Sequence, residues 1–271
     1  MDEAARVGTA PSQYGLRAFL RGVRAAVTLL TRIPVGGFPY SDTEWRWSAA
    51  HLPAVGALLG CLYGGVWVAC TRAGDLAAAA VVTATSLLAT GALHEDGLAD
   101  TADALGGGRT REGILALLKD SRIGAFGGAA LAMTLVLRVV LLARLGQAAP
   151  VALVLTAAAS RLVPVWLMAA LPYVTGPSVA KSSAVAAAGR PQVLVATAWT
   201  AAVTGAIGSA HALIGTELAL VWVVALVVAF ACGRVFKSRT GGITGDFLGA
   251  AQQVSECTML LALAIARGGP P

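Results

Sequence analysis

The chain alternates between long apolar segments and short polar ones. Seven apolar segments come close to the roughly 20 residues that an α-helix needs to cross the hydrocarbon core of a membrane. They cover residues 50–71, 75–93, 123–146, 148–172, 191–212, 217–235 and 247–266. This pattern predicts an all-α protein: a polytopic, integral membrane helical bundle with about seven transmembrane helices, within a range of six to eight.

An eighth apolar stretch, 18–35, is interrupted by Arg21, Arg24 and Arg32. Charged side chains at that spacing favour an interfacial or re-entrant segment over a span. The residues before it are polar and resemble neither a cleaved signal peptide nor a span. We therefore expect a flexible tail over 1–17 and a single transmembrane domain over 18–268.

Composition supports the membrane assignment. Hydrophobic residues make up 57% of the chain, charged residues 13%, and the mean hydropathy is +0.75, which is too apolar for a soluble domain of this length. The four cysteines lack the spacing of a metal site. The net charge of +6 lies in the loops between spans, so it argues for membrane topology and against nucleic acid as a partner.

Lysine and arginine are distributed unequally between the two sides of the predicted bundle. One side carries fifteen of them, whereas the other carries only Arg72, Arg144 and Arg267. Cytoplasmic loops are enriched in positive charge, so the richer side is predicted to be cytoplasmic. With seven spans, this topology brings 94–122, 173–190 and 234–246 to the cytoplasmic face and places the C-terminus outside.

The most informative motif is acidic and follows the second apolar segment. Asp96, Asp100 and Asp103 are spaced i, i+4 and i+7, so a helix would place them on one face, with Glu95 about a quarter turn away. Like charges at this spacing destabilise a helix unless a cation binds. Hard oxygen ligands suit Mg²⁺, with Mn²⁺ also possible. The alternative is a solvated acidic helix end without a ligand.

Cationic residues recur near the same predicted face. Arg suits bidentate contacts with phosphate and Lys acts as a point charge, although these residues could also be ordinary membrane anchors, and Asp246 a helix cap. An arginine within a span, such as Arg161, needs a partner in the bundle interior. The candidate phosphate or substrate contacts are Arg32, Lys119, Asp120, Ser121, Arg122, Arg161, Lys237, Arg239, Thr244 and Asp246.

These motifs together resemble the cobalamin synthase (adenosylcobinamide-GDP ribazoletransferase) family. The resemblance covers about residues 20–265. It rests on Thr31-Arg32-Ile33-Pro34, the acidic run from His94 to Asp103, Lys119 to Gly124, Gly241-Gly242 and Thr244 to Asp246, then Leu248-Gly249-Ala250 and Glu256. The segment 174–178 lacks the charged, Arg-containing pattern of that family, and Glu95 replaces a leucine found in some members.

The resemblance implies a membrane phosphotransferase that joins adenosylcobinamide-GDP to α-ribazole or its 5′-phosphate and releases GMP. It implies Mg²⁺ dependence and a location in the prokaryotic inner membrane, with the active site facing the cytoplasm. Glu95, Asp96, Asp100 and Asp103 would be catalytic, the three aspartates would hold the metal, and Asp103 or Glu95 would accept the hydroxyl proton. A homo-oligomer or association with other enzymes of the corrinoid pathway stays open.

Two other functions remain as alternatives. A phosphotransferase acting on a lipid alcohol would release CMP rather than GMP. A cation transporter would use the carboxylates as ion ligands near the middle of the membrane, often on broken helices. The acidic run adjoins a basic loop, and this favours phosphate chemistry over transport.

Overall fold

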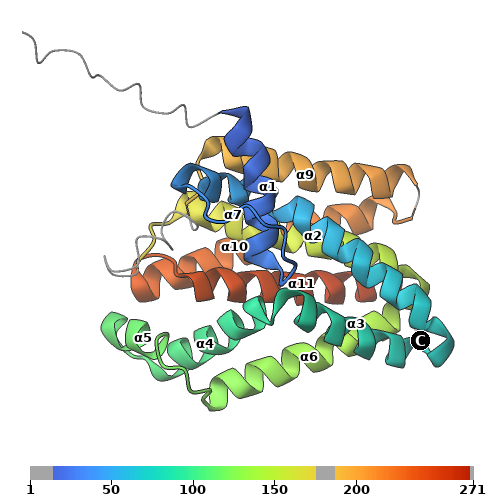
Figure 1. The fold of residues 1–271 in the computed structure, drawn as a ribbon. Helices are drawn as coiled ribbons and strands as arrows, with labels where there is room; N and C mark the ends of the chain where they lie inside the picture. Colours follow the sequence, from blue (N-terminus) through green and yellow to red (C-terminus); the bar gives the residue numbers. More distant parts are fainter. Residues whose placement is uncertain (1–14, 175–186, 211, 269–271) are drawn as a thin grey trace, which may run out of the picture.

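The computed structural model describes residues 15–174, 187–210 and 212–268 (Figure 1). All regular elements in these ranges are helices, apart from a single parallel bridge between Tyr173 and Ile243. The prediction of an all-α protein is therefore confirmed. Most of the predicted tail lies outside the described residues.

Ten α-helices and two 3₁₀ turns make up the described part of the chain. In chain order they are α1 (Leu16–Leu30), α2 (Asp42–Cys70), η1 (Thr71–Ala73), α3 (Asp75–Thr90), α4 (Leu93–Gly107), α5 (Arg111–Leu117), α6 (Ala125–Leu145), η2 (Gly146–Ala148), α7 (Ala149–Ala170), α9 (Arg190–Ser209), α10 (Gly215–Thr240) and α11 (Gly245–Arg267).

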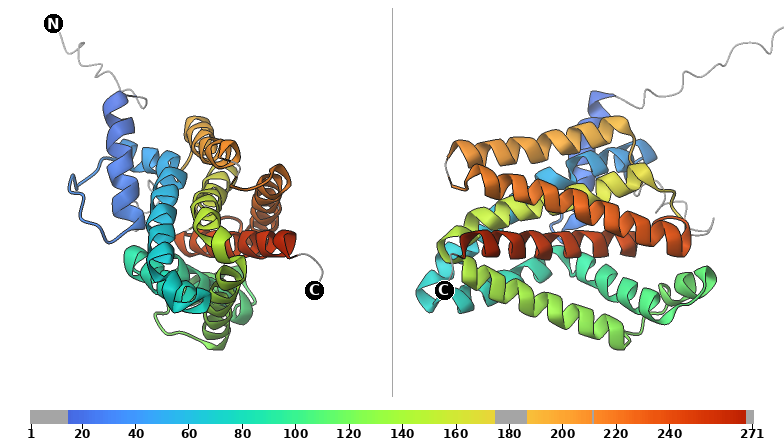
Figure 2. Two further views of the ribbon diagram at one scale, coloured as in Figure 1. Left: turned by 90° about the vertical axis from the view of Figure 1, so that its right-hand side faces the viewer. Right: turned by 180° about the vertical axis from the view of Figure 1, so that it is seen from behind.

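Five segments of the described chain are long and apolar enough to cross a membrane, or six if α3 and α4 form one broken span. One of the five, 125–170, contains both α6 and α7, and these fold back at η2 as the two views of Figure 2 show. The structure thus supports a polytopic helical membrane protein. The exact number of spans stays a prediction.

Helix α1 differs from the predicted spans in length and direction. It has only 15 residues and runs across the long helices in Figure 1, packed against α2. Its exposed apolar side chains include Leu16 and Leu20, while Arg21 pairs with Glu44 of α2 at 3.0 Å. A short amphipathic helix of this kind agrees with the predicted non-spanning segment.

The interior is built around α2, α7 and α11. Gly56 and Gly60 allow α2 to touch the α7 backbone, because a Cβ at Gly60 would lie 2.5 Å from the Cα of Val154. Small residues at such crossings permit the close packing that holds membrane helices together. In contrast, α6, α9 and α10 expose large apolar side chains such as Val136, Leu194 and Phe230, as expected for surfaces that contact lipid.

A sharp break between α3 and α4 positions the acidic motif. The two helices meet at 90°, and the turn uses Gly91 and Ala92, both with positive φ. The bend directs α4 against α11, where a Cβ on Gly97 would lie 3.1 Å from the Cα of Asp246 and 3.3 Å from that of Gly249. The glycine at 97 therefore serves close packing with α11.

Candidate functional site

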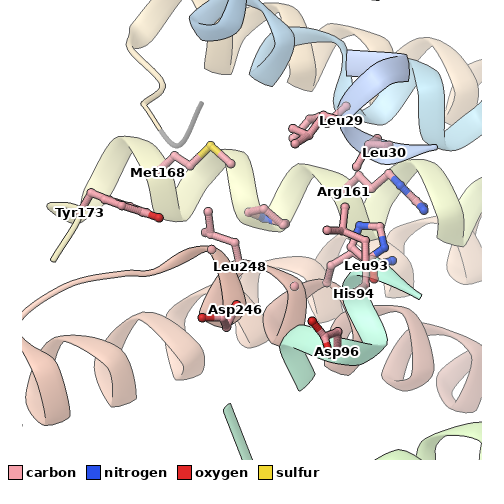
Figure 3. Close-up of a pocket in the computed structure, with 15 residues that line it drawn as sticks. Leu29, Leu30, Leu93, His94, Asp96, Arg161, Met168, Tyr173, Asp246 and Leu248 are labelled. Carbon is pink, nitrogen blue, oxygen red and sulfur yellow. The ribbon is translucent and has the colours of Figure 1, made fainter. Parts of the chain in front are cut away.

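Carboxylates from two helices meet beside a cavity. Asp96 of α4 and Asp246 of α11 both line this cavity and lie near one another below it in Figure 3. Asp100, one turn after Asp96, interacts electrostatically with Asp96, Asp103 and Asp246. Asp246 lies in the first turn of α11, whose N-cap is Thr244, so the reading of Asp246 as the cap is wrong.

Asp103 is bound to the protein backbone. Its two carboxylate oxygens accept hydrogen bonds from the N–H groups of Gly124 at 2.6 Å and Gly127 at 2.9 Å. These N–H groups belong to the start of α6, where a helix has donors without intrahelical partners. Asp103 therefore joins α4 to α6, and this structural contact competes with its predicted role as a metal ligand.

Glu95 lies apart from the aspartates. Its side chain is buried, and Oε1 accepts a hydrogen bond of 2.9 Å from Nε2 of Gln253 on α11. The charged groups that act on it are Arg138, Arg161 and Glu256 in the bundle interior. The structure thus places Glu95 in a buried polar network in the bundle interior.

A metal would have to draw its ligands from α4 and α11 together. Within the described ranges, no group of three His, Cys, Asp or Glu side chains already has the arrangement of a metal site. Asp96 and Asp246 nevertheless line the cavity, and the carboxylates of Asp96, Asp100 and Asp246 repel one another. This chemistry fits Mg²⁺, which takes one or two carboxylates and completes its shell with water and phosphate oxygens.

The apolar cavity has a volume of about 350 Å³ and lies between α1, α2, α4, α7 and α11. Arg161 and His94 close one end of it, whereas Met168 and Tyr173 lie at the other end (Figure 3). Arg161 is 3% exposed and donates to the carbonyl of Ala157 at 2.8 Å. The prediction that Arg161 faces the bundle interior is confirmed.

A polar hollow of about 480 Å³ adjoins the apolar cavity. The two spaces share Leu29, Leu93 and Asp96. The lining of the polar hollow is rich in hydroxyl and backbone groups: Thr28, Leu29, Thr31, Arg32, Thr90, Gly91, Ala92, Leu93 and Asp96. Arg32 lies across the α3–α4 break, where a Cβ on Gly91 would overlap its guanidinium. The structure therefore brings Arg32 to the acidic site.

The predicted cationic loop before α6 is exposed. Arg122 forms a bidentate pair with Asp120, with Nη2 2.6 Å from Oδ2, and these hydrogen bonds lower the pKa of Asp120 to about 2. Lys119 and Ser121 are also exposed. Since Asp103 binds Gly124 at the end of this loop, the loop is tied to the acidic helix, but its side chains line neither the apolar cavity nor the polar hollow.

Arg239, one of the predicted phosphate contacts, makes hydrogen bonds to the backbone of the protein. Arg239 at the end of α10 donates to the carbonyls of Gly108 at 2.7 Å and Leu105 at 3.2 Å. In return, Arg111 donates to the carbonyl of Thr240 at 2.8 Å. These contacts fasten α10 to the C-terminal end of α4, while Lys237 is exposed.

A buried polar network lies deeper in the bundle, and the sequence analysis did not predict it. Arg138 and Glu256 form an ion pair of 3.0 Å, and Gln252 donates to Glu256 at 2.6 Å and to the hydroxyl of Ser160 at 3.0 Å. The signal in the sequence was the adjacent Gln252 and Gln253 within an apolar segment. Buried polar groups in a membrane bundle require partners, and these helices supply them to one another.

Comparison with known proteins identifies the family. Residues 22–264 match the family model of cobalamin-5-phosphate synthase. Adenosylcobinamide-GDP ribazoletransferases from a Polaromonas species, Vibrio parahaemolyticus and Ralstonia nicotianae are 38%, 35% and 40% identical to the chain. The alignments cover 91%, 97% and 92% of this chain and 97%, 97% and 96% of those proteins. No solved structure matches. The chain therefore belongs to the cobalamin-5-phosphate synthase family.

Proposed function

We propose that this chain is an adenosylcobinamide-GDP ribazoletransferase. It joins adenosylcobinamide-GDP to α-ribazole, or to α-ribazole 5′-phosphate, and forms adenosylcobalamin or its 5′-phosphate together with GMP. A ribose hydroxyl of the acceptor attacks the phosphorus attached to cobinamide. A new O–P bond forms, the bridging P–O bond of the diphosphate breaks, and the hydroxyl proton passes to a base.

One arrangement supports this proposal most directly. Asp96 lies where the apolar cavity and the polar hollow meet, opposite Asp246 and one turn before Asp100. A transferase that joins two substrates needs both bound on either side of its reacting groups. The apolar cavity and the polar hollow, which share Asp96 in their linings, meet this requirement.

The individual side chains have distinct tasks in this proposal. Asp96 or Asp246 accepts the proton of the attacking hydroxyl, because both line the cavity, whereas Glu95 and Asp103 do not line it and both oxygens of Asp103 accept backbone hydrogen bonds. Arg32 holds phosphate oxygens of the donor from the polar hollow. Asp96, Asp100 and Asp246 would hold Mg²⁺, which neutralises diphosphate charge when bound.

In this proposal the protein lies in the inner membrane and its site faces the cytoplasm. The exposed Lys119 and Arg122 lie between α5 and α6, the exposed Lys237 lies in the last turn of α10, and all three belong to the predicted side richer in positive charge. Soluble nucleotide substrates would reach the site from that side.

The decisive assay uses the full chain in lipid nanodiscs. The protein is mixed with adenosylcobinamide-GDP, α-ribazole and Mg²⁺, and GMP and corrinoids are quantified by chromatography. We expect GMP and adenosylcobalamin in equal amounts, and loss of both when EDTA is added. Parallel reactions use α-ribazole 5′-phosphate to determine which acceptor is preferred.

Two results would contradict the proposal. Folded protein that forms no corrinoid product, but releases CMP from a CDP-alcohol and a lipid acceptor, would indicate a lipid phosphotransferase. Undiminished turnover in EDTA would reject the metal requirement while leaving the reaction in place.

A further inference from the structure

The apolar cavity combines apolar walls with a polar end. Its apolar walls include Leu30, Leu52, Pro164, Met168 and Leu248. Its volume of about 350 Å³ lies near the lower end of the range of roughly 300–1,000 Å³ typical of small-molecule sites. A space of this size suits a nucleoside and is too small to enclose a corrin macrocycle.

Two buried polar atoms at this cavity lack a partner among the described residues. They are Nε of Arg161 and Oε1 of Gln252, on side chains that are 3% and 0% exposed. Arg161 uses Nη1 to bind Ala157, and Gln252 uses its amide nitrogen to bind Ser160 and Glu256. Buried donors and acceptors are rarely left unpaired in folded proteins, so both atoms are available to hydrogen-bond a ligand in this cavity.

The neighbouring polar hollow differs in character. It is lined by Thr28, Thr31 and Thr90 and by the guanidinium of Arg32, and it meets the apolar cavity at Asp96. Guanine and diphosphate carry polar atoms on most of their edges, and hydroxyl groups and an arginine satisfy them better than leucine side chains do. The donor substrate therefore matches the polar hollow, and the apolar cavity is left for the acceptor.

We propose that the apolar cavity holds the aromatic base of the acceptor nucleoside. A benzimidazole-type base has apolar faces and edges and one free ring nitrogen, which accepts a hydrogen bond from Arg161 at the closed end. The ribose then lies at the opening, where its hydroxyl faces Asp96 and Asp246. This assignment rests on the proposed transferase function and makes the cavity walls the determinants of base specificity.

The test fills the cavity without touching the carboxylates. Met168 lines the cavity, so Met168→Trp would occupy the space of the base. Met133→Trp is the matched control, because Met133 is 57% exposed on α6. The binding of α-ribazole alone is measured by calorimetry in nanodiscs, and the KM of each substrate is measured in the turnover assay.

We expect Met168→Trp to raise both the Kd and the KM of α-ribazole by at least about tenfold, with the KM of adenosylcobinamide-GDP changed by less than about twofold. Met133→Trp should change none of these values. A rise confined to the KM of adenosylcobinamide-GDP, or unchanged α-ribazole binding in a folded Met168→Trp protein, would overturn the proposal. Competition by guanosine rather than by 5,6-dimethylbenzimidazole would assign the cavity to the donor and overturn it as well.

The test separates the two proposals. If wild-type protein binds α-ribazole and Met168→Trp abolishes binding, but no cobalamin is ever formed, the cavity assignment stands and the transferase function fails. If Met168→Trp does not fold, Met168→Ala replaces it. The wider cavity should then favour an acceptor with a bulkier aromatic base, and an unchanged ratio of KM values would contradict the assignment.

Discussion

Arg138 of α6 and Glu256 of α11 form a 3.0 Å ion pair in which both side chains are only 3% exposed. The pair is extended by Gln252, which donates to the second carboxylate oxygen of Glu256. It therefore links α6, one of the lipid-facing helices, to the interior helix that carries Asp246. A buried pair of this kind places two charges where neither can be solvated alone.

Removing one partner of this pair should be worse than removing both. We expect Arg138→Met or Glu256→Leu alone to lower the free energy of unfolding by about 3–5 kcal/mol, because the remaining charge is left buried and unpaired. The double variant should lose less than either single variant. Thermal unfolding in detergent measures all three, and a double variant less stable than both single variants would contradict this account.

Asp103 and Asp100 should respond oppositely to substitution. Asp103→Ala removes the acceptor for Gly124 and Gly127 and should lower stability by about 1–3 kcal/mol. Asp100→Asn removes a charge that is repelled by Asp96 and Asp246, so it should stabilise the protein in EDTA. Thermal unfolding in EDTA measures the stability of both variants relative to the unsubstituted protein.

The same pair of variants separates structure from catalysis. We expect Asp100→Asn to reduce kcat by about 10²-fold or more, since it removes a charge from the reacting site. Asp103→Ala should keep more activity than Asp100→Asn when assayed below its own unfolding temperature. Full Mg²⁺-dependent turnover by Asp100→Asn would reject the assignment of Asp100 to the metal site.

Two adjacent glycines of α6 should tolerate alanine very differently. A Cβ at Gly127 would overlap the carboxylate of Asp103, whereas a Cβ at Gly128 meets nothing within 4 Å. Gly127→Ala should therefore lower stability by about 1–3 kcal/mol through overpacking. Gly128→Ala should raise it by about 0.5–1 kcal/mol, as alanine usually does within a helix. Equal changes in the unfolding temperature of the two variants would show that Gly127 does not pack against Asp103.

Arg32 should act on the donor substrate. It lines the polar hollow beside Asp96, so Arg32→Gln should raise the KM of adenosylcobinamide-GDP by about 10- to 100-fold, the range for a lost hydrogen bond to a charged group. Arg24→Gln, an exposed change on α1, is the control. A rise in the KM of α-ribazole instead would place the acceptor in the polar hollow.

The orientation in the membrane can be tested by labelling. In a variant without native cysteines, Ser121→Cys should react with an impermeant maleimide only after the cells are permeabilised, since its loop carries Lys119 and Arg122. Arg72→Cys, in the turn after α2, should react in intact cells. The reverse pattern would invert the topology and place the site on the outer face.

The sequence alone was sufficient to locate the long apolar helices. Each predicted span from 50–71 to 247–266 overlaps an observed helix, because an uninterrupted apolar run in lipid must satisfy its backbone hydrogen bonds within itself. Local signals also mark helix ends, as for α4, which ends at Gly107 within the run Gly106-Gly107-Gly108. These features depend on neighbouring residues only.

The sequence also identified the acidic motif, since the spacing of Asp96, Asp100 and Asp103 follows from the helix period. It could not distinguish their environments. Asp103 binds the start of α6 and Glu95 binds Gln253, and both partners are distant in the chain. Helix periodicity describes which face a residue occupies, but not what lies opposite that face.

The tertiary structure alone decided how the site is assembled. The 90° break after α3 turns the acidic helix onto α11, and Gly97 lets Asp246 approach it. The same packing leaves a cavity closed by Arg161 and a hollow lined by Arg32, which meet at Asp96. The sequence determined which segments form long apolar helices and which of them carry the acidic and cationic residues, because these depend on local composition, whereas the grouping of those residues depends on close contacts between helices far apart in the chain.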